Sequence, residues 1–162
     1  MHSRSLQPLA SQVLFADDSI MLSKTADYAL RAAICLAEHG KSGSGSMSAE
    51  QLAERTRVPR RYLHRVLQGL AAHQIIDSRP GPGGGYSLAK PPASIDLLQV
   101  VNAVSPIERI RHCPLGISSH TSLCPLHAEL DKAYAQTEKA FAGVTLQELL
   151  DSTSKVKPLC EE

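Results

Sequence analysis

The 162-residue sequence has no tryptophan, and aromatic residues make up only 4% of it. Aliphatic side chains must therefore fill the core, a composition that favours helices over a β-sandwich or β-barrel. The four cysteines are too few and too scattered for a disulfide framework. The chain also lacks an apolar run near the ~20 residues of a membrane span, and its first twenty residues lack the apolar core of a signal peptide. These absences predict a cytoplasmic protein with reduced thiols and no membrane partner.

A large net charge is missing as well, since the formal value is +1, but the charges are distributed unevenly. Residues 21–92 contain ten Lys and Arg against five Asp and Glu, a net of +5. Residues 93–162 contain six against nine, a net of −3. A local basic surface matters more than the total charge when the partner is a polyanion. The first half of the chain is therefore the candidate for binding nucleic acid.

The clearest local signals lie in this basic half. Apolar residues repeat with helical spacing over 23–39. Ser48 and Gln51 have the spacing of a capping box, which starts a short second helix. After a tight turn, Pro59 suits the first position of a third helix that extends to about residue 73. The predicted order is helix, short helix, turn and helix.

A β-hairpin follows the third predicted helix. Two alternating segments, 75–79 and 86–89, flank a loop at 80–85 in which every residue is Pro or Gly. The chain is therefore predicted to be mainly α-helical with a small β-hairpin wing, which is the winged helix-turn-helix architecture.

The acidic half is predicted to be helical around one irregular segment. Ser94 is expected to cap a short helix, whereas residues 105–123 show no period. A long helix follows at 125–141, and Thr145 with Glu148 forms a second capping box. The apolar stripe of the long helix consists of Leu126, Leu130, Ala133, Thr137 and Phe141. Such a stripe needs a second surface, either a partner or the chain's own winged domain.

The predicted organisation has five parts. They are a disordered or non-native N-terminal extension at 1–20, a winged helix-turn-helix domain at 21–92, a linker helix with a cysteine-containing sensor loop at 93–123, a dimerisation helix with a short terminal helix at 124–150, and a flexible tail at 151–162.

An arginine cluster supports DNA binding by the winged domain. Five arginines fall within eleven residues that contain no acid: Arg55, Arg57, Arg60, Arg61 and Arg65. The second helix of such motifs enters the major groove, where each bidentate Arg–guanine contact discriminates by about 1–3 kcal/mol. Arg79 adds a charge at the base of the wing, and Gly83 and Gly84 allow close approach to DNA because they carry no Cβ. The alternative is a solvated helix face. A nucleotide-binding loop is disfavoured, because a strand follows the glycines and no Gly-Lys-Ser/Thr is present.

Two segments resemble the IscR/NsrR/CymR family of regulators (the Rrf-two family). They are Met21-Leu22-Ser23-Lys24 with the following Asp27-Tyr28-Ala29-Leu30-Arg31-Ala32, and Arg79 to Ala89 with its glycine-rich wing and Tyr86. The resemblance implies a homodimer in which the helix at 125–141 crosses its partner, so that two winged domains read a palindromic operator. It also implies that DNA lies near the wing and near Lys24, Tyr28, Arg60, Arg61, Tyr62, His64 and Arg65. Tyr62 is equally compatible with the core, beside Leu63.

The resemblance further implies a sensor site between the wing and the long helix, where several members bind an iron–sulfur cluster through three cysteines. Cys113 and Cys124 lie in this region, but the middle cysteine is absent. A [2Fe–2S] cluster is the favoured cofactor, with His120, His127 or Asp27 as further ligands, the last by analogy with relatives in which the partner supplies it. Zinc, a thiol switch and two buried thiols without a cofactor are the alternatives.

The chain is expected to be a regulator, and more specifically a repressor that senses redox state, nitric oxide or iron–sulfur status. An enzyme built on a Cys–His pair is disfavoured, because no oxyanion hole or orienting third group is evident. A winged-helix regulator without a cofactor, and an interaction adaptor that has lost DNA binding, remain open alternatives.

Overall fold

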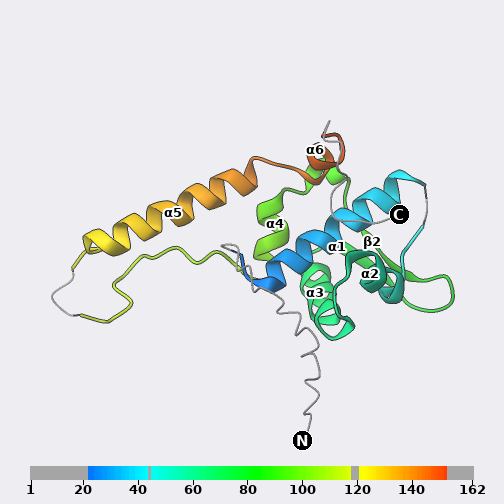
Figure 1. The fold of residues 1–162 in the computed structure, drawn as a ribbon, viewed down its shortest axis with the longest axis horizontal. Coiled ribbons are helices and arrows are strands. Elements are labelled where there is room, and N and C mark those ends of the chain that lie inside the picture. The colour runs from blue at the N-terminus through cyan, green and yellow to red at the C-terminus, as the bar shows by residue number, and fades with distance from the viewer. Residues whose placement is uncertain (1–21, 44, 118–120, 153–162) are drawn as a thin grey trace, which may run out of the picture.

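A computed structural model describes residues 22–43, 45–117 and 121–152 (Figure 1). The elements are α1 (Lys24–Lys41), α2 (Ala49–Thr56), α3 (Arg60–Ala72), β1 (Ile76–Arg79), β2 (Gly85–Leu88), the 3₁₀ turn η1 (Pro92–Ser94), α4 (Leu97–Asn102), α5 (Pro125–Ala142) and α6 (Leu146–Leu150). The predicted fold class is confirmed: the described residues are mainly helical, with one antiparallel hairpin. The extension predicted at 1–20 and most of the tail predicted at 151–162 lie outside the described residues.

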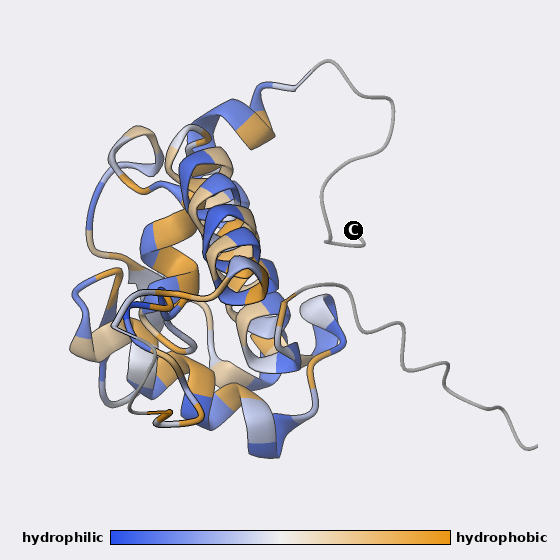
Figure 2. Cartoon of the chain, turned by 90° about the vertical axis from the view of Figure 1, so that its left-hand side faces the viewer, coloured by the Kyte–Doolittle hydropathy of each residue, from blue (hydrophilic) through white to orange (hydrophobic). Residues whose placement is uncertain are grey.

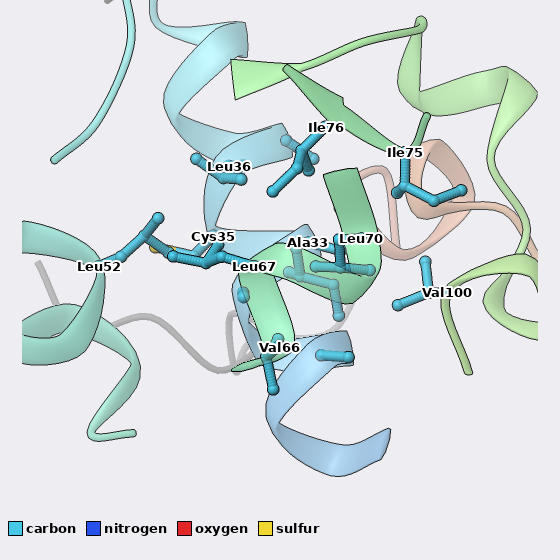
Figure 3. Close-up of a cluster of buried hydrophobic side chains, with 14 of the residues drawn as sticks. Ala33, Cys35, Leu36, Leu52, Val66, Leu67, Leu70, Ile75, Ile76 and Val100 are labelled. Carbon is cyan, nitrogen blue, oxygen red and sulfur yellow. The ribbon is translucent and has the colours of Figure 1, made fainter. Parts of the chain in front are cut away.

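The core forms around α1, which contacts α2, α3, α4, α6 and β2. Its alanines, such as Ala29, Ala32 and Ala33, are fully buried and let neighbouring helices approach closely. Figure 3 shows side chains of several elements converging there, among them Leu52 of α2, Leu67 of α3 and Ile76 of β1. Aliphatic residues therefore fill the core, as the scarcity of aromatics predicted.

Short-range capping bonds fix where several helices begin. The Ser23 hydroxyl accepts from the Ala26 amide and starts α1. Both predicted capping boxes are present, with Ser48 capping α2 and Thr145 capping α6. These caps satisfy amide groups at the helix starts that have no partner within the helix.

Two predicted helix starts are wrong by one or two residues. Pro59 is the N-cap of α3 rather than its first residue. Ser94 ends η1, and the cap of α4 is Asp96, whose carboxylate accepts from the Gln99 amide at 2.8 Å. Between them, Ile95 is extended and fully buried, and this extended residue separates η1 from α4.

A short backbone bridge joins the starts of α4 and α6. The Leu97 amide donates to the Val144 carbonyl at 3.0 Å, and the Leu146 amide donates to the Ile95 carbonyl at 2.9 Å. Leu146 is fully buried in the common core. Both α4 and α6 therefore share the core of the winged helix.

The long helix α5 projects away from this body (Figure 1). Figure 2 shows the molecule from the side on which α5 projects, with apolar and polar segments mixed over that face. None of the described helices combines the length and apolarity needed to cross a membrane.

Candidate DNA interface and sensor region

The turn between α2 and α3 sets the direction of the predicted recognition helix. Thr56 and Val58 are buried, and the Thr56 hydroxyl donates to the Leu52 carbonyl at 2.6 Å. Arg57, between them, is exposed and adopts a left-handed conformation with φ 54°. Anchors on both sides of Arg57 thus hold its backbone in a region that non-glycine residues rarely occupy.

One face of α3 is buried and the other is exposed. The buried stripe consists of Leu63, Val66, Leu67 and Leu70. The exposed residues include Arg60, Arg61, His64 and Arg65, which are the side chains that the sequence proposed for DNA. Arg60 contacts Glu50 of α2 at 2.8 Å, but both side chains are about two-thirds exposed, so the pair contributes little stability. These groups are accessible to a polyanion.

Arg55 differs from its neighbours in the arginine cluster. Its guanidinium faces α1, where it lies 3.9 Å from the Glu38 carboxylate and is only 30% exposed. It therefore belongs to the contact between α1 and α2.

Four side chains of α1 and α3 form a ladder of rings and guanidinium groups. The Tyr28 and Tyr62 rings lie 5.9 Å apart and are tilted. The Arg61 guanidinium lies 4.6 Å from the Tyr62 ring centre and donates to the Tyr62 hydroxyl at 3.1 Å. On the other side, Arg31 lies 5.9 Å from the Tyr28 ring. The sequence left open whether Tyr62 lies on the surface or in the core. In the structure Tyr62 is 44% exposed and therefore lies on the surface.

The wing is a short hairpin in which Arg79 pairs with Gly85 across the strands. It is attached to the start of α2 by two backbone bonds between Met47 and Tyr86, of 2.9 and 2.8 Å. Arg79 is exposed at the end of β1. The wing therefore sits beside the helix-turn-helix. Arg79 belongs to the last strand pair before the loop, so its cationic side chain lies near the tip of the wing rather than at the base that the sequence predicted.

The structure explains one of the wing glycines by contacts within the loop, which the sequence did not predict. A Cβ on Gly84 would lie 2.2 Å from the Arg79 carbonyl oxygen, so the turn itself excludes a side chain there. Gly83 instead has φ +75° and open space around it. The turn itself therefore requires glycine at position 84, whereas a side chain at position 83 would extend into open space.

The candidate metal-binding residues assemble only in part. The Cys124 sulfur, at the start of α5, lies 3.3 Å from Nδ1 of His127. Cys113 is a half-buried free thiol, and Asp27 contacts Arg31 of its own helix at 2.9 Å. His120 lies outside the described residues. No group of three or more metal-ligating side chains occurs among the described residues. The donor types suit a cluster, but the described residues of one chain do not bring a complete ligand set together.

A charged clamp, which the sequence did not suggest, joins the irregular segment to α5. Arg109 donates to both carboxylate oxygens of Asp131 and to Glu138, and Asp131 also accepts from the Ile110 amide at 2.9 Å. The hydrogen bonds from Arg109 hold the pKa of Asp131 below its usual value, and those bonds raise the pKa of Arg109. The segment just before Cys113 is thereby fixed to the long helix.

The exposed face of α3, the adjacent wing and the buried turn between α2 and α3 define a winged helix-turn-helix protein of the kind that binds double-stranded DNA. A family model described as "Rrf2: Iron-dependent Transcriptional regulator" matches residues 22–152. The chain belongs to the Rrf2 family.

Individual relatives agree with this assignment. An rrf2-like HTH-type transcriptional regulator of Rhodobacter capsulatus is 28% identical over 155 residues, which covers 88% of this chain and all of the relative. The structure of IscR from T. potens has a TM-score of 0.68 at 20% identity, covering 85% of this chain and 90% of that one. CymR, the global cysteine regulator of B. subtilis, has a TM-score of 0.66 at 22% identity, covering 83% and 99%. The expected resemblance and the function as a DNA-binding transcriptional regulator rather than an enzyme are confirmed.

Proposed function

We propose that the protein acts as a homodimeric repressor that reads a palindromic operator. The observation that carries this proposal is the exposure of α5: none of its 18 residues is buried. Leu126, Leu130 and Tyr134 are 65, 41 and 38% exposed and lie four residues apart, on one side of the helix. An apolar face of this kind is stabilised when a second copy covers it, and a two-fold dimer presents its two readers to a two-fold symmetric site.

Each protomer would contact one half-site through α3, the start of α1 and the wing. The proposed DNA-contacting residues are Lys24, Tyr28, Arg57, Arg60, Arg61, His64, Arg65, Arg79, Gly83 and Gly84. The exposure of the arginines supports major-groove reading and phosphate contact. As a DNA-binding regulator of transcription, the protein is proposed to act in the cytoplasm.

The dimer is tested by sedimentation of Leu126→Ser beside the control Lys132→Ala. Lys132 lies two residues beyond Leu130, about 200° further round the helix, and is exposed. Wild type and Lys132→Ala should sediment as dimers and select a palindrome from random duplexes. Leu126→Ser should shift toward monomer and lose affinity for the palindrome. Equal sedimentation of all three proteins as monomers contradicts the proposal.

We propose that the dimer senses iron–sulfur or redox status at Cys113 and Cys124. The description of the family as iron-dependent and the presence of two thiols before and at the start of α5 support this. Here the two thiolates would hold a [2Fe–2S] cluster, and His127, His120 or Asp27 of a second copy would complete the ligand set. A bound cluster would supply a centre that responds to oxidants or nitric oxide. The ion pair between Arg109 and Asp131 joins the segment just before Cys113 to α5, so a change at the proposed cluster could be passed to this helix.

Anaerobic purification with iron, sulfide and zinc analysis tests the sensor. His112 is an exposed neighbour of Cys113, and its replacement serves as the control. The His112→Ala protein should contain as much iron and as much sulfide as wild type. Cys113→Ala and Cys124→Ala should contain neither. Zinc in place of iron, or colourless protein with no metal, contradicts the cluster.

The contact between Cys124 and His127 favours a second candidate, a metal-free thiol switch. Cys113 and Cys124 are both free thiols, and two such thiols are what a reversible disulfide needs. In this case oxidation should change DNA affinity in metal-free wild type and leave Cys124→Ala unaffected. Unchanged affinity in oxidised wild type contradicts the switch.

A further inference from the structure

The ladder between α1 and α3 holds one arginine of the recognition helix in a defined orientation. Arg61 both stacks over the Tyr62 ring at 4.6 Å and donates to the hydroxyl of the same residue at 3.1 Å. The two contacts restrict different motions, since stacking fixes the plane of the guanidinium and the hydrogen bond fixes its rotation. Arg61 thus has less rotamer freedom to lose when it binds a partner.

Tyr62 is itself supported from the first helix. Its ring packs against Tyr28, and the tilted geometry at 5.9 Å is within the range favoured by aromatic pairs. Tyr28 is half-buried against the core. An exposed guanidinium on α3 is therefore connected, through two rings, to the most buried helix of the fold.

We infer that Tyr62 is a positioning residue that pre-orients Arg61 for reading a base, with Tyr28 as its support. This inference rests on the proposed DNA interface. Arg60 is held differently, by an exposed ion pair with Glu50, so the stacked geometry distinguishes Arg61 from this neighbouring arginine of α3. A fixed planar fork suits the two acceptors that guanine presents in the major groove.

The free protein provides a test that is independent of DNA. The Arg61 Nε–Hε resonance should be displaced by the Tyr62 ring in wild type and should return to the position of an unrestrained arginine in Tyr62→Leu. Tyr62→Phe, which keeps the ring and removes only the hydroxyl, should retain most of the displacement. An unrestrained position in wild type would overturn the inference without bearing on DNA binding.

A double-mutant cycle tests the consequence for recognition, using a duplex that the wild-type protein selects from a random pool. An exposed cation–π contact changes affinity by about two- to fivefold, and two half-sites raise this to about 4- to 25-fold for Tyr62→Leu. In an Arg61→Ala background the same change should have no further effect. Discrimination against unrelated DNA should fall, whereas the salt dependence, which reports phosphate contacts, should be retained.

Equal losses from Tyr62→Leu in both backgrounds would overturn the inference, because Tyr62 would then act without Arg61. Gln99→Leu, at an exposed position of α4, a helix with no proposed DNA contact, is the control and should leave affinity unchanged. If Tyr62→Leu fails to fold, Tyr62→Phe carries the same cycle with a smaller expected loss. A wild-type protein that selects no duplex contradicts the proposed DNA interface instead, and the resonance test still decides whether Tyr62 orients Arg61.

Discussion

Replacement of Gly69 by alanine should change the free energy of unfolding through two effects of similar size and opposite sign, a gain in helix propensity and a steric clash. Gly69 lies inside α3, where alanine is favoured over glycine by about 0.8–1.0 kcal/mol. However, a Cβ at this position would lie 2.8 Å from Cγ1 of Val104 and 3.0 Å from the Ala103 carbonyl oxygen. Overpacking of this kind costs about 1–3 kcal/mol. We expect a net loss of about 1 kcal/mol, because the backbone carbonyl cannot rotate away as a side-chain tip can.

Thermal and urea unfolding measure this balance. A loss of about 1 kcal/mol lowers the Tm of a chain of this length by about 2–4 °C. Gln68→Gly, at the exposed neighbouring position, reports the helix-propensity effect alone and should be destabilised by a similar amount. Adding Val104→Ala to Gly69→Ala should recover part of the loss attributable to the clash. A Gly69→Ala protein that melts above wild type would show that α3 and the end of α4 are not in close contact, and would refute the reasoning.

Three further perturbations test other contacts. Ser48→Ala removes the cap of α2 and should lower the free energy of unfolding by about 1 kcal/mol in urea titrations. Gly84→Ala should abolish amide-exchange protection in the wing, whereas Gly83→Ala, which meets no atom but has φ +75°, should only weaken it. Because Arg109 lowers the pKa of Asp131, that carboxylate stabilises the fold above the usual Asp range, and this contribution is lost as the pH falls through the lowered value. Stability should therefore decline more steeply below about pH 4 in wild type than in Asp131→Asn. Parallel acid titrations would count against the clamp.

The parts of the fold that sequence reasoning predicted correctly are those that depend on neighbouring residues. The capping boxes of Ser48 and Thr145 span three residues each, and side chain and amide meet in any helix that begins there. The Pro/Gly loop likewise determines a hairpin from its own backbone preferences. The start of α4 was predicted wrongly because Ile95 is held extended by a partner some 50 residues away, at Leu146.

The spacing of the arginines predicted the candidate DNA interface, but it did not predict which side chains each arginine contacts. Spacing placed Arg55 in the same cluster as Arg61, although one faces Glu38 of α1 and the other stacks on Tyr62. The role of Arg109 depends on Asp131, which is 22 residues away across a segment with no period. Such pairs depend on how the helices are arranged in space, which a single sequence does not encode in any local pattern.

The backbone bridge between the starts of α4 and α6 makes residues 97–144 a loop closed at its base. A partner that pulls or twists α5 therefore applies its load to two attachment points at once, one on each side of the helix. The winged helix can remain folded while the part of the loop beyond α4 changes shape, provided that α4 keeps its place in the core and the base stays closed. Conversely, a chain that stops at the end of α5 loses Leu146 from the core and both hydrogen bonds of the bridge, so the segment from Val144 to the first residue of α6 supports the DNA-reading end of the molecule.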